Sequence, residues 1–339
     1  MIAIQTTKRL CILLASLAAS LPAAADTLRL PADGDNVVGA INLATVVGDE
    51  KVLDVVRAYD QGFNEVKIAN PGIDMLGWGG KGEELVIPSQ YVLPDTPHEG
   101  VVLNVAEMRL YFYPKAKSGE PRVVITHPVA IGRENWTTPH GVTKVVAKIK
   151  DPVWVPPKSI RKEHLEDFGE VLPAVVPAGP DNPMGQFALK LGLPGYYIHG
   201  TDIGKIDGIG MRVTHGCVRL YPKDISRIFA EVPVGTSVRI VNQPFKIGRL
   251  HDSLYLEAHP YLEDDPAAKQ DPYNVVVNLL IAALGDARSE IDWNQIRSAI
   301  AVRNGIPVKI GRILDGSPLE AQRQAQSTES KKEVIQQVW

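Results

Sequence analysis

The residue best suited to do chemistry in this chain is Cys217, in the run Thr214-His215-Gly216-Cys217-Val218-Arg219-Leu220. His199 lies eighteen positions upstream and ends the run Tyr196-Tyr197-Ile198-His199. The other cysteine of the sequence, Cys11, lies in a segment that we expect to be removed on export. The mature chain would then hold one thiol and could form no intramolecular disulfide. A lone thiol near histidines indicates a nucleophile rather than a structural cross-link.

A thiol attacks as the thiolate, so Cys217 needs a base or a positive field close by. His199 ends one strand-like run, Cys217 begins another, and the Gly-rich segment 201–210 joins them. Two adjacent strands joined in this way would bring the imidazole within hydrogen-bond reach of the sulfur. The Gly200 carbonyl could then hold the ring tautomer. The amides of Gly216 and Cys217 could bind an oxyanion.

Arg219 lies two residues beyond Cys217, which puts it on the same face of the predicted strand. Its charge could lower the thiol pKa or bind a carboxylate. Two other interpretations remain open. Cys217 could be an inert core thiol. Alternatively, a zinc ion could be held by Cys217, His199 and His215, with His127 or His140 as the fourth ligand.

Residues 1–25 have the pattern of a signal peptide. Lys8 and Arg9 precede the apolar run Leu10–Leu21, which is too short to span a bilayer, and Ala23-Ala24-Ala25 offers a cleavage site. An uncleaved membrane anchor is the alternative. Losing Lys8 and Arg9, and no acidic residue, moves the net charge from −3 to −5. We therefore expect an exported, periplasmic chain with no membrane span after cleavage and no nucleic-acid partner.

A small module is predicted over residues 41–88. Apolar residues at helical spacing over 54–59 and a second short helical pattern over 62–70 precede a strand-like run at 84–88. With a strand in front, the expected order is strand, helix, helix, strand. Pro94 and Pro97 mark a linker to the next domain.

A mostly β domain is predicted over residues 98–242. Its strand-like runs are 101–105, 108–113, 122–126, 142–147, 187–191, 196–199 and 236–241, with a short helix at 224–229. Seven prolines between 151 and 183 are expected to exclude long regular elements there. We interpret that insertion as a lid or groove wall beside the active site.

The remainder of the chain carries no recognisable chemical motif. Helical patterns over 273–284 and 294–304 predict a helical C-terminal appendage spanning 250–319. Residues 320–339 are polar with few apolar anchors, which predicts a disordered tail.

A histidine followed by a spacer and then Ser/Thr-His-Gly-Cys resembles the pattern of L,D-transpeptidases with a YkuD-like catalytic domain. The resemblance covers about 98–242 and includes Thr138-Pro139-His140-Gly141 and Gly208-Ile209-Gly210-Met211-Arg212. The order of histidine before cysteine separates this pattern from papain-like and NlpC-type peptidases. Residues 41–88 resemble a LysM carbohydrate-binding module, in Val47-Gly48-Asp49, Ala69-Asn70-Pro71-Gly72 and Leu85-Val86-Ile87-Pro88. Together these features are similar to periplasmic Gram-negative members.

The resemblance implies a fold, a reaction and a set of roles. The fold would be a β-sandwich-like catalytic domain behind a small α/β LysM-like domain. The implied catalytic residues are Cys217 as nucleophile, His199 as base, Gly200 as its orienting carbonyl, and Gly216 with Cys217 as oxyanion hole. The implied substrate contacts are Thr214, His215, Arg219 and Tyr197.

The implied donor is a peptidoglycan tetrapeptide stem on its glycan strand, which is attacked at its diamino acid and loses D-alanine. The acceptor would be an amine of another stem, giving a 3-3 cross-link, or a lysine of an outer-membrane Braun-type lipoprotein. Water would give a carboxypeptidase. No metal or other cofactor is implied. A catalytically inactive wall-binding protein is the alternative from another functional class.

Overall fold

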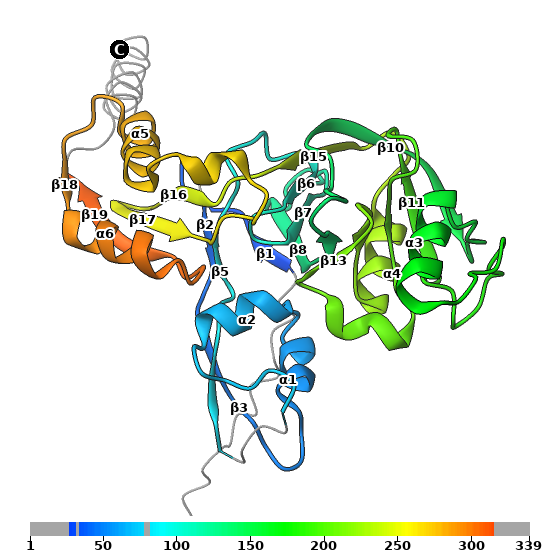
Figure 1. The fold of residues 1–339 in the computed structure, drawn as a ribbon. Helices are drawn as coiled ribbons and strands as arrows, with labels where there is room; N and C mark the ends of the chain where they lie inside the picture. The colour runs from blue at the N-terminus through cyan, green and yellow to red at the C-terminus, as the bar shows by residue number, and fades with distance from the viewer. Residues whose placement is uncertain (1–26, 32–33, 78–81, 315–339) are drawn as a thin grey trace, which may run out of the picture.

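The computed structural model describes residues 27–31, 34–77 and 82–314 (Figure 1). The predicted signal peptide, the predicted tail over 320–339 and most of the Gly-rich connection at 78–82 lie outside these residues. Three folded units follow one another along the chain: a small unit with two short helices, a central β-rich unit, and a C-terminal unit (Figure 1). None of the helices within the described ranges is long and apolar enough to cross a membrane.

The small unit has the predicted order of elements. β3 (Asn42–Thr45) is followed by α1 (Val52–Ala58), α2 (Phe63–Ala69) and β4 (Glu84–Ile87), and β3 pairs antiparallel with β4. The two helices bury one apolar face each against the strands, which is the pattern that their spacing predicts. The buried residues of this core include Val46, Val52, Val56, Val66, Leu85 and Ile87. A second ribbon, β2 (Val37–Gly39) with β5 (Gln90–Val92), leads out of the unit.

The central unit is built on one nine-stranded sheet, so this part of the chain is mostly β. Its strand order is β1-β8-β7-β6-β15-β10-β11-β12-β14. The bounds are β1 (Thr27–Arg29), β6 (Gly100–Asn104), β7 (Arg109–Tyr113), β8 (Val123–Pro128), β10 (Gly141–Lys150), β11 (Phe187–Leu191), β12 (Tyr197–His199), β14 (Val218–Arg219) and β15 (Ser237–Val241). All the strands predicted between 98 and 242 are present, with ends shifted by a few residues.

The strand β10 bends this sheet. Its first four residues pair with β15, its remainder pairs with β11, and a register shift lies between Val145 and Ala147. A bulge of this kind raises the local twist and turns the strand. The predicted sandwich is therefore a single sheet folded at β10. Helix α4 (Pro222–Glu231) covers it and buries Ile225 and Ile228 in the core, as the predicted helix at 224–229 requires.

The Pro-rich insertion contains an eleven-residue helix, α3 (Lys158–Phe168), so the expectation that it excludes long elements is wrong. The prolines flank this helix and do not enter it: Pro157 precedes its first turn, and Gly169, with a φ of 70°, ends it. No residue of α3 is buried. The buried Asn182 holds the base of the insertion, because its amide nitrogen donates to the Pro152 and Pro177 carbonyls at 2.9 Å each.

The C-terminal unit is not the predicted helical appendage, because it contains a four-stranded sheet. The strands β16 (Phe245–Leu250), β17 (Ser253–Ala258), β18 (Ser289–Ile291) and β19 (Val308–Ile313) are ordered β16-β17-β19-β18. The predicted helices are present as α5 (Pro272–Leu284) and α6 (Trp293–Val302), and they pack on this sheet. Buried apolar residues alternate along β17 at Leu254, Leu256 and Ala258, a period-two pattern that indicates a strand.

A bidentate ion pair buried at the first junction joins the small unit to the central sheet. Arg109 of β7 donates from Nε to Glu65 Oε1 at 2.6 Å and from its terminal nitrogen to Glu65 Oε2 at 2.9 Å. Arg109 is 1% exposed, and Glu65 lies on α2. The same guanidinium lies over the Tyr91 ring, with its central carbon 4.4 Å from the ring centroid. This junction is therefore fixed by charge as well as by packing.

A second buried ionic cluster joins the central sheet to the C-terminal sheet. Lys246 of β16 lies 2.8 Å from Glu107 Oε2 and 2.8 Å from Glu257 Oε1, and all three side chains are at most 2% exposed. The Tyr111 hydroxyl donates to Glu107, and the ring of His259 contacts Glu257. Burial alone would lower the pKa of Lys246, but the two carboxylates outweigh burial and raise it. Lys246 is therefore charged, and its charge opposes burial, which raises the pKa of Glu107 above its usual range.

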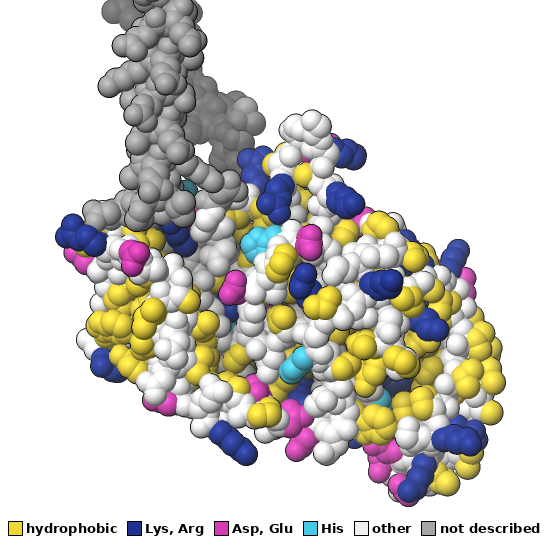
Figure 2. All heavy atoms as spheres, turned by 90° about the horizontal axis from the view of Figure 1, so that it is seen from above, with side chains coloured by type: hydrophobic (Ala, Val, Ile, Leu, Met, Phe, Trp, Pro, Cys, Tyr) yellow, Lys and Arg dark blue, Asp and Glu magenta, His cyan; other side chains and the backbone are white. Residues whose placement is uncertain are grey.

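The face drawn in Figure 2 shows Lys and Arg side chains spread among acidic and apolar ones. They do not gather into one basic patch on that face (Figure 2).

We expect Lys246→Met to lower the free energy of unfolding substantially. Met fills a similar volume without a charge, so Glu107 and Glu257 would stay buried without a cation. Breaking a buried pair from one side typically costs roughly 3–5 kcal/mol. Urea denaturation followed by tryptophan fluorescence measures the loss. Arg312→Met, which breaks an exposed pair with Glu290, is the control and should change little. Equal stability of the two variants would contradict a structural role for the cluster.

Candidate active site

Two neighbouring strands bring the predicted nucleophile and base together. His199 is the last residue of β12, and Cys217 directly precedes β14. The strands pair in parallel, with Ile198 opposite Val218 and His199 opposite Arg219. The predicted adjacency of these strands is therefore confirmed. The connection between them contains the 3-10 helix η1 (Ile203–Gly208) and β13 (Arg212–Thr214), which pairs with β9 (Ile131–Gly132).

The ring of His199 is buried and oriented by a backbone carbonyl. Its Nδ1 lies 2.7 Å from the Gly200 oxygen, and because a carbonyl can only accept, Nδ1 carries the proton. Burial lowers the pKa of His199 to about 3, and the charge of Arg219 adds to this, although the Gly200 and Met184 carbonyls oppose it. The ring is therefore neutral near pH 7, and Nε2 is the nitrogen available as a base.

The thiol of Cys217 is half-buried and protonated at rest. Burial raises its pKa, and this outweighs the backbone of Tyr197 and the charge of Arg219, which lower it. The sulfur lies 3.6 Å from the Gly195 carbonyl oxygen, to which the thiol can donate. No hydrogen bond joins His199 to Cys217 within the described residues. Both groups are therefore neutral at rest, with Nε2 of His199 free of a proton and the thiol of Cys217 still carrying one.

The hydroxyl groups of two threonines brace the loop that carries Cys217. Thr214 Oγ1 donates to the Cys217 carbonyl at 2.6 Å and accepts from the Gly216 amide at 3.2 Å. Thr138 Oγ1 donates to the Gly216 carbonyl at 2.9 Å and accepts from the Gly132 amide at 3.0 Å. Thr214 is buried, so its hydroxyl shapes the loop from within. In the described part of the chain the Cys217 amide has no acceptor, which leaves it available for an oxyanion.

Gly216 adopts a conformation that other residues rarely take. Its φ is +100°, and a Cβ at this position would lie 2.7 Å from Tyr196 Cε1 and 3.3 Å from the Thr137 carbonyl oxygen. Tyr196 therefore packs directly against the loop that carries Cys217, whereas the residue expected at the site from the sequence is its neighbour Tyr197. Tyr197 contributes through its backbone, which favours the thiolate of Cys217.

His215 contacts three residues that the sequence analysis did not assign to the site. Its Nε2 lies 2.5 Å from Glu163 Oε2 on α3 and 3.1 Å from a terminal nitrogen of Arg133. Arg133 and Glu163 form an ion pair, and Trp136 packs edge-on against the His215 ring with 4.9 Å between centroids. Hydrogen bonds to His215 and Arg133 hold the pKa of Glu163 below its usual range. Neither Glu163 nor Arg133 lies in a motif, so the sequence offered no signal for them.

The other histidines considered as zinc ligands lie elsewhere. His127 is buried against Asp60, with 2.8 Å from Nδ1 to Oδ2, and His140 lines a cavity of about 210 Å³. Among the described residues, the acidic and histidine groups that do converge are Asp60, His127 and Asp224, and Glu107, Glu257 and His259. The ligand atoms of His199, His215 and Cys217 do not converge, so the zinc interpretation is not supported.

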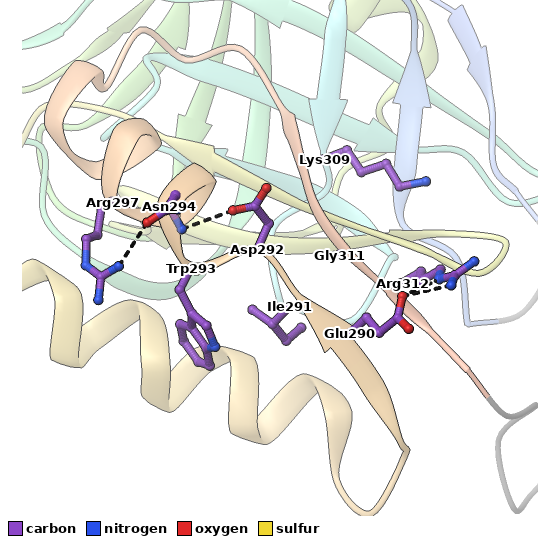
Figure 3. A pocket seen from close by; sticks show the side chains of 9 residues that line it. All are labelled: Glu290, Ile291, Asp292, Trp293, Asn294, Arg297, Lys309, Gly311 and Arg312. Carbon is purple, nitrogen blue, oxygen red and sulfur yellow. Dashed lines mark hydrogen bonds and ion pairs between the residues drawn. The ribbon is translucent and has the colours of Figure 1, made fainter.

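A wider hollow of about 840 Å³ lies on the C-terminal unit (Figure 3). Its lining residues are Glu290, Ile291, Asp292, Trp293, Asn294, Arg297, Lys309, Gly311 and Arg312. All of them come from 290–312, so this hollow does not belong to the site around Cys217.

Comparison with known proteins gives a consistent result. The YkuD family, described as the L,D-transpeptidase catalytic domain, matches residues 98–240. The chain is 41% identical over 293 residues to a probable L,D-transpeptidase, YbiS, of Escherichia coli K12, covering 85% of this chain and 93% of that protein. A probable L,D-transpeptidase, ErfK/SrfK, of Salmonella typhimurium is 40% identical over 289 residues, covering 83% and 90% respectively.

We expect Gly216→Ala to remove activity while leaving the fold in place. A non-glycine residue at this φ carries strain of roughly 1–3 kcal/mol, and its methyl group would displace Tyr196 and the loop. Activity and thermal melting measure the two effects separately. Gly235→Ala is the control, because its φ is also positive, at +92°, but its Cβ would meet nothing. Full activity of Gly216→Ala would show that the tight loop is not needed.

We expect alkylation of Cys217 by iodoacetamide to reach half its maximal rate above pH 9.0, the ordinary value for this thiol, because burial raises its pKa. Arg219→Met removes a charge that lowers the thiol pKa, so the midpoint should move still higher. Mass spectrometry of the chain without residues 1–25 follows the reaction. A midpoint below pH 9.0, or a downward shift in Arg219→Met, would contradict this assignment.

Proposed function

The chain belongs to the YkuD family of L,D-transpeptidases, and from this membership we propose a mechanism in which Cys217 is the nucleophile and His199 the general base. The protein is an L,D-transpeptidase, an acyltransferase that acts on peptidoglycan. The observation that supports the residue assignment best is the parallel pairing of β12 with β14. It sets Cys217 beside the strand that ends in His199, whose Nδ1–H is held by the Gly200 carbonyl.

The first half of the reaction acylates Cys217. The sulfur attacks the carbonyl of the diamino acid in a tetrapeptide stem, and His199 Nε2 accepts the thiol proton. The Cys217 amide donates a hydrogen bond to the oxyanion. The Gly216 amide can donate a second one once its hydrogen bond to Thr214 Oγ1 breaks. The carbon–nitrogen bond then breaks, His199 returns the proton to the leaving amine, and D-alanine departs from a thioester. The thiol thereby divides one difficult displacement into two easier ones.

The second half transfers the acyl group. An amine attacks the thioester, loses a proton, and leaves an amide and a free thiol. The acceptor amine belongs to another stem, giving a 3-3 cross-link, or to a lysine of a Braun-type lipoprotein. Attack by water gives carboxypeptidase activity, which is the second candidate. It is favoured by the half-exposed position of Cys217, because water reaches the thioester as readily as an amine does.

The parts outside the catalytic unit fit this function. The signal-peptide pattern over 1–25 supports a periplasmic location, where peptidoglycan is assembled. The strand-helix-helix-strand order of 42–87 supports a LysM-like module that binds glycan strands. A catalytically inactive wall-binding protein would keep that module but would not release D-alanine from the stem. Release of D-alanine therefore distinguishes an active transpeptidase from an inactive wall-binding protein.

Intact-protein mass spectrometry tests the mechanism. We expect the mature chain, mixed with a disaccharide-tetrapeptide, to form a transient adduct that lacks D-alanine. Cys217→Ala should form none, and His199→Gln should acylate at least a hundredfold more slowly, because general-base catalysis contributes roughly 10²–10⁴-fold. The small products identify the acceptor, as a dimer or a tripeptide. Wild-type chain that neither forms an adduct nor releases D-alanine would overturn the proposal.

A further inference from the structure

The loop that carries Cys217 and the segment that follows β9 present two nitrogen donors to one carboxylate. Arg133 and the His215 ring lie 3.1 Å apart, and the carboxylate of Glu163 contacts both of them. His215 is separated from Cys217 by Gly216 alone. A guanidinium beside an imidazole is a site that suits a carboxylate, because both groups donate to its oxygens.

The donors are held firmly. The Arg133 amide donates to the Thr214 carbonyl at 3.0 Å, and Thr138 ties the same segment to Gly216. Trp136 packs against the edge of the His215 ring. These contacts fix Arg133 and His215 to the loop that carries the nucleophile.

The carboxylate comes from an element at the surface. Glu163 lies on α3, none of whose residues is buried. The side chains of Arg133, Glu163 and His215 are 37%, 24% and 31% exposed, so water screens their attraction and the net stabilisation is small. Another carboxylate can replace Glu163 without leaving a charge buried and unpaired.

We propose that Arg133 and His215 bind the C-terminal carboxylate of the donor stem, and that Glu163 occupies this subsite until the donor displaces it. The inference rests on the function proposed above, in which the bond broken is the last one of the stem. The residue that leaves then bears a free carboxylate one residue beyond the attacked carbonyl. Arg133 and His215 are fixed beside Cys217 and bind that carboxylate. Their position therefore determines which peptide bond lies next to the sulfur.

The exchange also couples donor binding to the insertion. Glu163 is the residue of α3 that contacts the catalytic loop through both Arg133 and His215. A donor carboxylate that takes these partners frees α3 from the loop. Binding of such a stem thus removes a link between the insertion and the loop that carries Cys217.

Binding to the Cys217→Ala chain tests the proposal without turnover. The probes are a disaccharide-tetrapeptide with a free C-terminal acid and the same compound with a C-terminal amide, titrated by calorimetry. We expect the acid to bind roughly tenfold more tightly, the size of one charge-assisted hydrogen bond. Adding Arg133→Met should remove this preference. Adding Glu163→Gln should strengthen binding of the acid several-fold and leave the amide unchanged.

Glu166→Gln is the matched control, since it makes the same change on the same helix at an exposed side chain that pairs with Lys162. It should change neither affinity. Arg133→Lys replaces the Met variant if the latter does not fold. Lysine keeps the positive charge but cannot donate two parallel hydrogen bonds to one carboxylate, so the preference for the acid should fall only partially. An unchanged preference in either Arg133 variant would overturn the assignment. If Glu163→Gln changed the affinity for the acid and for the amide equally, the contact of Glu163 would be merely structural. That result would overturn the proposal that the donor carboxylate displaces Glu163.

Release of D-alanine by the wild-type chain, measured in parallel, separates this inference from the function on which it rests. Release without any preference for the acid would overturn the carboxylate subsite alone. A clear preference for the acid without release would overturn the proposed reaction alone.

Discussion

The ammonium group of Lys246 lies 2.8 Å from two buried carboxylates that belong to two different sheets. Glu107 follows the strand β6 of the central sheet, whereas Glu257 lies on β17 of the C-terminal sheet. The second oxygen of Glu257 also accepts from the Val92 amide of β5, which leads out of the small unit. Because neither carboxylate can be charged in this interior without the cation, the three units are held in one arrangement. The bent sheet and its active site are assembled within that frame.

The active site depends on the bent sheet in two ways. The bend at β10 turns β11, β12 and β14 away from the first half of the sheet. His199 and Cys217 therefore lie at the edge of the sheet that β12 and β14 form. The segment from β9 through Thr138 then braces the catalytic loop from the other side, by strand pairing with β13 and by the hydroxyl of Thr138. Cys217 therefore lies between two parts of the chain that are remote in sequence, and neither part alone would fix its geometry.

Local patterns were sufficient to predict the strands of the central sheet other than β1, both helices of the small unit, and the pairing that brings Cys217 to His199. The C-terminal sheet was missed because β17 pairs with β19 more than fifty residues later, and such a pairing leaves only short alternating runs. Helix α3 was missed because the flanking prolines were counted without regard to the proline-free stretch between them. Glu163, Arg133 and Tyr196 were missed for another reason: their roles arise from tertiary contacts with Gly216 and His215, and no motif encodes such contacts.

The raised pKa of Cys217 has a consequence for the durability of the enzyme. Peroxides and disulfides react with the thiolate and hardly at all with the thiol, so susceptibility to oxidation follows thiolate character and exposure. Because burial favours the protonated thiol, Cys217 presents little thiolate in the substrate-free chain. Such a thiol resists oxidation to sulfenic acid and exchange with small disulfides for as long as the site is empty.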